Sequence, residues 1–180
     1  MKHVCVYCGS SDAVAQKYVD EAIKLGEALA KRGATLVYGG GNVGLMGKVA
    51  LAAQARGAKV IGVIPQRLVE REHVHRGCDE LIITQTMRER KAIMDEKSDA
   101  FIALAGGFGT LDETMEAITI RQLGFHQKPI VFLNTDGFYD LLLAFFEKLY
   151  AEGFAGRRFA PLYQVANTVE EALDLALNEA

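Results

Sequence analysis

The sequence predicts an α/β fold in which a mostly parallel sheet of about seven strands is flanked by helices on both faces. Three observations carry this prediction. Short β-branched runs alternate with longer amphipathic stretches, and within those stretches apolar residues such as Leu142, Phe145 and Leu149 recur at helical spacing. Gly33 and Gly57 stand where helix C-caps are expected. Together these patterns indicate a single doubly wound, Rossmann-like domain over residues 1–180.

Each expected strand is a short run of β-branched, aromatic or other apolar residues. In chain order the seven runs are Val4–Cys8, Thr35–Tyr38, Val60–Ile64, Glu80–Thr84, Phe101–Leu104, Ile130–Leu133 and the weaker Tyr163–Val165. The amphipathic stretches between and after them predict helices over Val14–Lys31, Leu45–Arg56, Met87–Lys97, Leu111–Leu123, Phe138–Glu152 and Val169–Asn178. Such helices supply the crossovers that parallel strand pairs need.

Composition excludes several classes of protein. Half of the 180 residues are apolar, so the chain can bury a sizeable core. A net charge of −3 without a long basic run argues against a nucleic-acid partner. No apolar run approaches the roughly 20 residues that span a bilayer, and the N-terminus enters a strand pattern without a signal peptide. We therefore expect a soluble, cytoplasmic protein, and the three cysteines fit a reducing compartment.

Cys5 and Cys8 form a C-x-x-C pair that has to be weighed as a redox or metal motif. The pair lies within a strand pattern, where residues three apart point to opposite faces, whereas a redox pair opens a helix. No second cysteine pair completes a zinc site. The stretch Gln66–Asp79 holds His73 and His75 and is expected to be a solvated loop or a short surface helix, with a flap over the substrate as the alternative. We predict no metal and no redox cofactor.

In doubly wound folds, ligands bind outside the carboxyl ends of the strands, where the strand order reverses. Four glycine-rich or polar segments follow expected strands: residues 9–11, residues 39–47, the turn before Met87, and residues 106–110. We expect these segments to converge on one crevice. Gly9 and Ser10 are therefore candidate ligand contacts.

Residues 39–44 read G-G-G-N-V-G and match the dinucleotide pattern G-x-G-x-x-G. The following strand, Val60–Ile64, ends without the acidic residue that a dinucleotide site requires, so NAD is disfavoured. A P-loop is excluded because valine stands where its serine or threonine belongs. Two alternatives remain, tight packing of strand on helix and contact with a ligand. The number of glycines favours the contact, with Gly40 and Gly41 as its candidates.

Residues 105–113, A-G-G-F-G-T-L-D-E, are the most informative stretch. An apolar strand pattern leads into three glycines, and a threonine and two acids follow at the start of a helix pattern. Bare glycine N–H groups and a helix N-terminus together favour an anion, so we predict a phosphate held beside a carboxylate. The residues concerned are Gly106, Gly107, Gly109, Thr110 and Glu113. The alternative is a T-x-x-E capping box, in which both side chains satisfy only helix N–H groups.

The helix expected from Met87 carries basic side chains among apolar ones. Met87, Lys91 and Met94 fall near one helical face, and Arg90 lies beside it. Two interpretations stay open. The charges are solvated on a surface helix, or an arginine keeps a carboxylate ionised and clamps a phosphate or hydroxyl groups. Phe108, between glycines in a bare turn, is the best candidate for stacking on a base.

These motifs together resemble the Lonely guy family of cytokinin riboside 5′-monophosphate phosphoribohydrolases, long labelled lysine decarboxylases. Residues 105–113 match the family signature P-G-G-x-G-T-x-x-E, residues 39–47 match G-G-G-x-x-G-L-M-G, and residues 87–91 match M-x-x-R-K. Two departures stand out. Ala105 replaces the proline of the signature, which is expected to loosen the loop without removing a donor. Arg121 stands where members often have a tryptophan, which is expected to alter the base pocket or the dimer contacts.

The resemblance implies hydrolysis of the N-glycosidic bond of a nucleoside 5′-monophosphate, such as AMP or N6-prenylated AMP, to the free base and ribose 5-phosphate. It maps the catalytic pair of the family onto Arg90 and Glu113, and the phosphate loop onto residues 106–110. It also implies a homodimer and no cofactor. A non-catalytic nucleotide sensor or carrier of the same fold is the alternative. A lysine decarboxylase would need pyridoxal phosphate on a lysine, and we can assign no such residue set.

Overall fold

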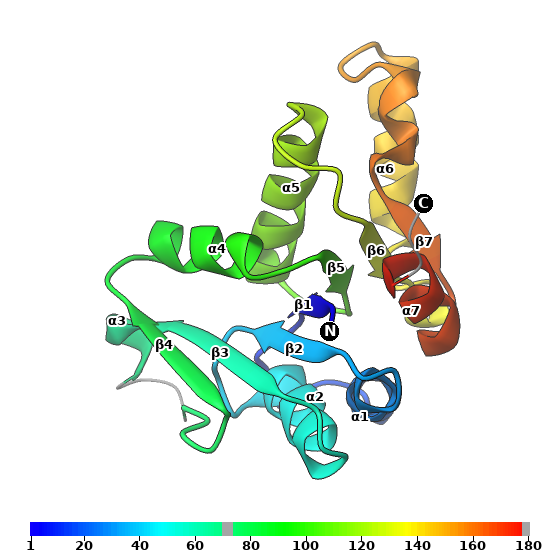
Figure 1. The fold of residues 1–180 in the computed structure, drawn as a ribbon. Coiled ribbons are helices and arrows are strands. Elements are labelled where there is room, and N and C mark those ends of the chain that lie inside the picture. The colour runs from blue at the N-terminus through cyan, green and yellow to red at the C-terminus, as the bar shows by residue number, and fades with distance from the viewer. Residues whose placement is uncertain (70–73, 178–180) are drawn as a thin grey trace.

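The computed structural model describes residues 1–69 and 74–177, and within them seven strands form one parallel sheet (Figure 1). The strand order is β4-β3-β2-β1-β5-β6-β7, and every neighbouring pair is parallel. The strands are β1 His3–Tyr7, β2 Thr35–Tyr38, β3 Val60–Pro65, β4 Glu80–Thr84, β5 Ala100–Ala103, β6 Ile130–Leu133 and β7 Gln164–Ala166.

Helices cover both faces of the sheet. Figure 1 shows α4, α5 and α6 on one face and α1, α2 and α7 on the other. The helices are α1 Gln16–Lys31, α2 Gly44–Ala55, α3 Gln66–Val69, α4 Met87–Glu96, α5 Phe108–Gln122, α6 Asp140–Ala151 and α7 Val169–Leu177, with short 3-10 turns η1 Thr135–Gly137 and η2 Arg157–Leu162. The predicted doubly wound α/β fold is thereby confirmed. No helix in the described ranges is long and apolar enough to cross a membrane.

The predicted bounds agree with the structure to within two residues, except at the start of α5. The predicted end of the last helix, Asn178, lies outside the described residues. All seven expected strands and all six expected helices are present. Helix α3 is the short helix that was one of the two expectations for Gln66–Asp79, whereas η1 and η2 were not predicted. Helix α5 begins at Phe108, three residues before the predicted Leu111, because its N-cap is Gly107 rather than Thr110. Gly33 and Gly57 both have positive φ just after helices, which confirms their predicted positions at helix C-termini.

The core has a layer on each side of the sheet. On the face covered by α1, α2 and α7, Leu36 of β2 packs in one buried cluster with Leu25 of α1. On the other face, Phe101 of β5 packs with Met94 of α4. Complete burial of a side chain of this size contributes roughly 1.5–3 kcal/mol, so the two layers hold the sheet rigid between the helices.

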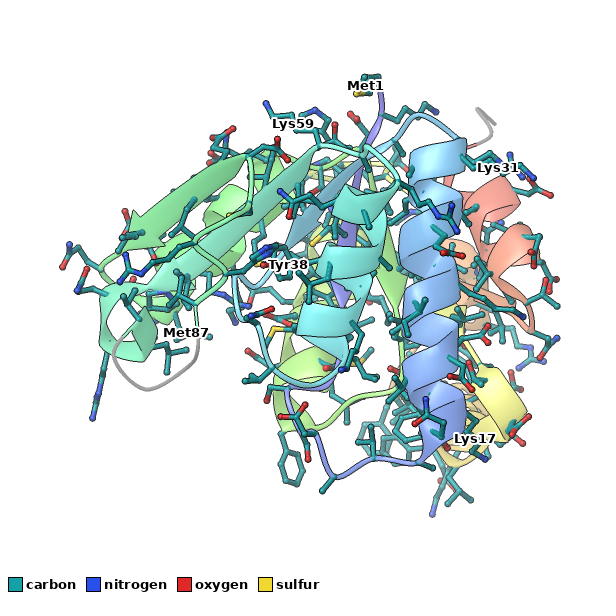
Figure 2. All side chains as sticks on the ribbon, turned by 90° about the horizontal axis from the view of Figure 1, so that it is seen from below. Met1, Lys17, Lys31, Tyr38, Lys59 and Met87 are labelled. Carbon is teal, nitrogen blue, oxygen red and sulfur yellow. The ribbon has the colours of Figure 1, made fainter. Side chains whose placement is uncertain are left out.

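Helices α1 and α2 lie side by side across the sheet, as Figure 2 shows from below. Gly26 of α1 permits this close approach. A Cβ atom at Gly26 would lie 2.4 Å from the carbonyl oxygen of Val49 and 2.8 Å from the backbone nitrogen of Ala53, both in α2. Glycine at this position therefore lets the two backbones meet.

The strand order reverses between β1 and β5. The chain runs from β1 outward to β4 and then returns to place β5 on the other side of β1. At the ends of these strands, the backbone N–H of Leu104 donates to the carbonyl of Tyr7 at 2.9 Å, and that of Gly9 donates to the carbonyl of Ala105 at 3.1 Å. These bonds fix the two outgoing turns beside each other, where a doubly wound fold binds its ligand.

The C-x-x-C pair belongs to the core. Cys5 and Cys8 are free and buried, and burial raises the pKa of each thiol far above its ordinary range. Neither thiol ionises readily, so neither resembles a redox cysteine. Of the two histidines considered as a pair, His73 lies outside the described residues, and His75 is buried. Within the described residues no group of three or more His, Cys, Asp or Glu side chains is arranged to hold a metal ion.

Candidate active site

The turn between β5 and α5 presents an open helix N-terminus. Helix α5 has Gly107 as its N-cap, and no side chain caps it. A Cβ atom at Gly107 or Gly109 would have no neighbour within 4 Å, so the space around this backbone is open. The first N–H groups of an α-helix have no partners within the helix and carry partial positive charge. The turn therefore has the form of an anion site.

Thr110 and Glu113 both lie inside helix α5, so the capping-box alternative was wrong. The side chain of Thr110 folds back over the turn, because a Cβ atom at Gly106 would lie only 2.1 Å from its Oγ1. Glycine at position 106 therefore makes room for the threonine. Glu113 lies one turn further along α5 and is buried.

Arg90 is placed by the start of helix α4. Thr86 is the N-cap, and its Oγ1 accepts a hydrogen bond from the backbone N–H of Glu89 at 3.1 Å. The Glu89 carboxylate in turn accepts from the backbone N–H of Gln85 at 2.7 Å. This T-x-x-E pair is a variant of the capping box, and it fixes the first turn of α4. Arg90 follows in that turn and points into the protein, where only 7% of its surface is exposed.

The guanidinium of Arg90 bridges strand β3 and helix α5. Its Nε donates to the carbonyl oxygen of Val63 at 3.0 Å, and its Nη1 donates to the carboxylate Oε1 of Glu113. The two side chains form a buried ion pair, with 8% and 9% of their surfaces exposed. This contact excludes the interpretation in which Arg90 is solvated on a surface helix.

Burial raises the pKa of Glu113 above the ordinary value of a glutamate, and the positive charge and hydrogen bond of Arg90 oppose that rise. Asp112 adds a smaller increase, and Lys91 a smaller decrease. The arrangement is a carboxylate whose protonation is set by its neighbours, as is common for groups that carry out proton transfer or stabilise charge.

Lys91 has a different environment from Arg90. Its Nζ forms ion pairs with Asp112 at 3.0 Å and with Glu116, both on α5, and its side chain is 16% exposed. Adjacent helical residues point about 100° apart, which explains why Lys91 and Arg90 contact different parts of α5. Lys91 ties α4 to α5, and it does not line the cleft beside Arg90.

A cleft of about 250 Å³ opens beside the ion pair. Eight of the residues that we predicted for the site line it: Gly9, Ser10, Met87, Arg90, Gly107, Gly109, Thr110 and Glu113. Four do not line it: Gly40, Gly41, Lys91 and Gly106. The other lining residues are Cys8, Gly39, Met46, Leu68, Phe108 and Asp112. The structure thus brings segments that follow β1, β2, β3 and β5 to one cleft, together with the start of α4.

Phe108 is the most exposed of the cleft residues. Its side chain is 93% exposed at the first position of α5, so it projects from the rim and does not belong to the core. The sequence singled it out for stacking on a base. The glycines on either side supplied that signal. Cys8, Met46 and Leu68 gave no such signal, because small and apolar residues are expected in a core wherever they stand.

The turn at residues 39–44 packs against β3, and one of its glycines lines the cleft. Gly40 has a φ of +76° and faces β3, where a Cβ atom would lie 3.0 Å from that of Ile64. Its carbonyl accepts a hydrogen bond from the backbone N–H of His75 at 3.1 Å. The ring Nδ1 of His75 lies 3.1 Å from the hydroxyl of Tyr38. Gly40 therefore serves the packing of this turn, and Gly39 is the glycine that faces the cleft.

The β2–α2 turn and the β1–α1 turn are tied to each other. The backbone N–H of Gly44 donates to the carboxylate of Asp12 at 3.0 Å, and that of Leu45 donates to the carbonyl of Gly9 at 3.0 Å. Gly44 has a φ of +55°, and a Cβ atom there would lie 2.4 Å from the backbone of Ser10. Glycine is required at this position for both reasons.

The family model described as "Possible lysine decarboxylase" matches residues 46–176. A cytokinin riboside 5′-monophosphate phosphoribohydrolase of Oryza sativa subsp. japonica, LOG, is 47% identical over 178 residues, covering 99% of this chain and 73% of its own. The corresponding Arabidopsis thaliana protein LOG2 is 48% identical over 153 residues, covering 85% of this chain and 72% of its own. The chain belongs to the Lonely guy family.

Two solved structures are also similar to this chain over most of its length. The molybdenum cofactor binding protein from Rippkaea orientalis superposes with a TM-score of 0.73 at 26% identity, covering 97% of this chain and 95% of its own. The molybdenum cofactor carrier protein from Chlamydomonas reinhardtii superposes with a TM-score of 0.73 at 25% identity, covering 96% and 93%.

The residues that line the cleft can be compared with those that a lysine decarboxylase would need, since that is the older label of the family. A pyridoxal phosphate enzyme holds its cofactor on a lysine. No lysine is among the residues that line the described part of the cleft, and Lys91 nearby is held by two carboxylates. The residues present therefore do not fit pyridoxal phosphate.

Proposed function

We propose that this protein hydrolyses the N-glycosidic bond of purine or cytokinin nucleoside 5′-monophosphates, giving the free base and ribose 5-phosphate. The observation that carries the proposal is the buried Arg90–Glu113 pair beside the open N-terminus of α5. The relatives named as phosphoribohydrolases match at 45–50% identity over most of this chain.

In this proposal the 5′-phosphate of the substrate binds at the β5–α5 turn. The backbone N–H groups at Gly107 and Gly109 and the hydroxyl of Thr110 supply donors, and the helix N-terminus supplies partial positive charge. Gly9 and Ser10 form the facing wall of the cleft. AMP and N6-prenylated AMP carry this phosphate equally, so both are proposed substrates.

Binding of the phosphate at one end orients the ribose toward the ion pair. The bond between C1′ and N9 breaks with its electron pair passing to the base, and the sugar acquires oxocarbenium character. The carboxylate of Glu113 stabilises that charge or activates the attacking water, whose oxygen forms the new bond to C1′. One proton of that water goes to Glu113, which releases it to solvent, and the departing base takes up one proton from solvent. The products are therefore neutral base and ribose 5-phosphate, and Glu113 returns to its ionised form.

Arg90 has two tasks in this scheme. Its charge opposes the effect of burial on the pKa of Glu113, which favours the ionised carboxylate that the reaction needs. It also has N–H groups beyond those used by Val63 and Glu113, and these are available to a substrate hydroxyl or phosphate. The scheme uses no metal and no cofactor.

We further propose that the protein is a cytoplasmic homodimer. Three large apolar side chains near the end of α5 and after α6 are mostly exposed: Leu123 at 66%, Phe125 at 79% and Phe154 at 85%. A second copy that covered them would remove this apolar surface from water. Buried free thiols suit a reducing compartment. A nucleic acid and a membrane are not among the proposed partners.

The second candidate is a carrier without catalytic activity, because two solved neighbours are named for binding or carrying the molybdenum cofactor. Those neighbours are 25–26% identical to this chain, whereas the phosphoribohydrolases are 45–50% identical. A carrier also has no need for a buried carboxylate paired with an arginine. Hydrolysis is therefore the function that the geometry supports best.

Product analysis separates the candidates. The purified protein is incubated in separate reactions with AMP, N6-prenylated AMP and lysine, and adenine, ribose 5-phosphate and cadaverine are quantified. The proposal predicts base and ribose 5-phosphate in equal amounts and no cadaverine. Tight binding of AMP without any product would instead support the carrier.

A further inference from the structure

We propose that Gly39 is a positioning residue for Arg90, because its missing side chain leaves the space in which the guanidinium lies. This inference rests on the proposed function only where activity is measured. Within residues 39–44 the number of glycines favoured ligand contact through Gly40 and Gly41, and the structure assigns Gly39 a separate task.

Hydrogen bonds hold two of the three nitrogens of the Arg90 guanidinium, and the third lies against a turn. Nε donates to the carbonyl of Val63 in β3, and Nη1 donates to Glu113 in α5. Nη2 lies against Gly39 in the turn after β2, and it is the atom nearest to the place that a Cβ atom of residue 39 would take. Among the described residues, no protein acceptor bonds Nη2, so its donors remain for a ligand in the cleft that Arg90 and Gly39 both line.

A side chain at position 39 would collide with this arrangement. A Cβ atom there would lie 2.4 Å from Nη2 of Arg90, 2.9 Å from Sδ of Met46 and 3.6 Å from Cζ of Arg90. Real Cβ atoms do not approach other heavy atoms to 2.4 Å. Either the guanidinium or the turn would have to move.

The backbone does not itself require glycine at position 39. Gly40 and Gly44 have positive φ values of +76° and +55°, which disfavour any side chain, whereas Gly39 is not among the residues with positive φ. Alanine is thus compatible with the local conformation at position 39. The need for glycine there comes from Arg90 and Met46 alone.

Met46 and Arg90 differ in how freely their side chains can move away from a Cβ atom at position 39. The thioether of Met46 ends a flexible side chain and can rotate away. The guanidinium is buried and held at two points, so it can retreat only by giving up the carbonyl of Val63 or the carboxylate of Glu113. The Gly39→Ala variant is therefore expected to disrupt the ion pair while leaving the fold in place.

The experiment compares Gly39→Ala with the unchanged protein by two readouts. Carboxyl NMR titration of a 13C-labelled protein reports the pKa of Glu113, and kinetics with AMP as probe report kcat and KM across pH. Gly156→Ala is the control for glycine replacement, since a Cβ atom there meets only the side chain of Arg158 at 3.7 Å or more. The double variant Gly39→Ala/Met46→Ala, compared with Met46→Ala, removes the second collision.

We expect the pKa of Glu113 to rise in Gly39→Ala, since Arg90 normally opposes the rise. The kcat should fall about 10²-fold, the loss that a misplacement of about 1 Å produces, with its acidic limb moved to higher pH. In the double variant Gly39→Ala/Met46→Ala, neither the pKa of Glu113 nor kcat should return to the value found in Met46→Ala. An unchanged pKa of Glu113 in Gly39→Ala, or full restoration by Met46→Ala, would overturn the inference.

Two further outcomes are informative. If Gly39→Ala does not fold, the substitution is repeated in an Arg90→Ala/Glu113→Gln background, which holds neither the guanidinium nor an unpaired buried charge. Gly39→Ala should cost much less stability in that background than in the unchanged protein, and an equal loss in both would overturn the inference. If the unchanged protein does not hydrolyse AMP, the proposed function fails, yet the NMR titration still decides whether Gly39 positions Arg90.

Discussion

Replacing Glu113 with glutamine tests the chemistry of the site with little change in shape. The variant Glu113→Gln removes the negative charge but keeps an oxygen that can accept the hydrogen bond from Nη1 of Arg90. In the proposed reaction the lost charge faces the positive sugar of the transition state. Removing one preorganised group of this kind costs about 10²–10³ in kcat, equivalent to roughly 2.7–4 kcal/mol.

Stability should also fall, and the size of the loss has an upper limit. Breaking a buried ion pair by removing one partner costs about 3–5 kcal/mol, because the other charge is left uncompensated. Glutamine keeps the hydrogen bond, so the loss in Glu113→Gln should lie below that range. The control is Glu116→Gln, one turn further along the same helix. Its side chain is 40% exposed, so its pairing with Lys91 contributes roughly 0–1 kcal/mol at most.

The assay measures AMP affinity by calorimetry, turnover by release of adenine, and stability by urea unfolding for both variants. We expect Glu113→Gln to bind AMP with an affinity close to that of the unchanged protein while losing turnover, and Glu116→Gln to keep both. Full turnover in a folded Glu113→Gln protein would refute the role assigned to this carboxylate.

Three other predictions follow from the same geometry. At saturating AMP, kcat should fall as the pH drops through the raised pKa of Glu113, because the carboxylate must be ionised. The midpoint should lie above the ordinary pKa of a glutamate, and a pH profile of kcat without this acidic limb would contradict the role assigned to Glu113. Arg90→Lys should lower kcat/KM about 10²-fold, because one ammonium group cannot reproduce the planar guanidinium that bonds both Val63 and Glu113. Kinetics equal to those of the unchanged protein would contradict the need for both bonds. Gly26→Ala should lower the free energy of unfolding by about 1–3 kcal/mol in urea titrations, because its Cβ atom meets the backbone of α2, while KM for AMP stays unchanged; undiminished stability would show that the helices separate without cost.

The sequence predicted the sheet and the main helices well, because strand and helix periodicities are local properties. It placed the start of α5 three residues late for an equally local reason. Thr110 and Glu113 have the spacing of a capping box, but the carboxylate is taken by an arginine 23 positions away in sequence. A tertiary contact of this kind leaves no trace in the sequence around Thr110.

The basic helix illustrates the same limit. Whether Arg90 is solvated or buried depends on how α4 packs against β3, and the sequence of α4 alone left both interpretations open. Its neighbour Lys91 proved to face two carboxylates on α5. Within the glycine motif, the sequence also favoured Gly40 and Gly41 for ligand contact. It gave no means of recognising that Gly39 is the glycine beside the arginine.

A crystal structure of Glu113→Gln with AMP tests the central claim most directly, because the variant should bind the nucleotide without consuming it. We predict the phosphate oxygens within hydrogen-bond distance of the backbone N–H groups at residues 107–110, with C1′ of the ribose facing position 113 and Arg90. AMP bound with its phosphate away from this turn, or with C1′ directed out of the cleft, would contradict the account.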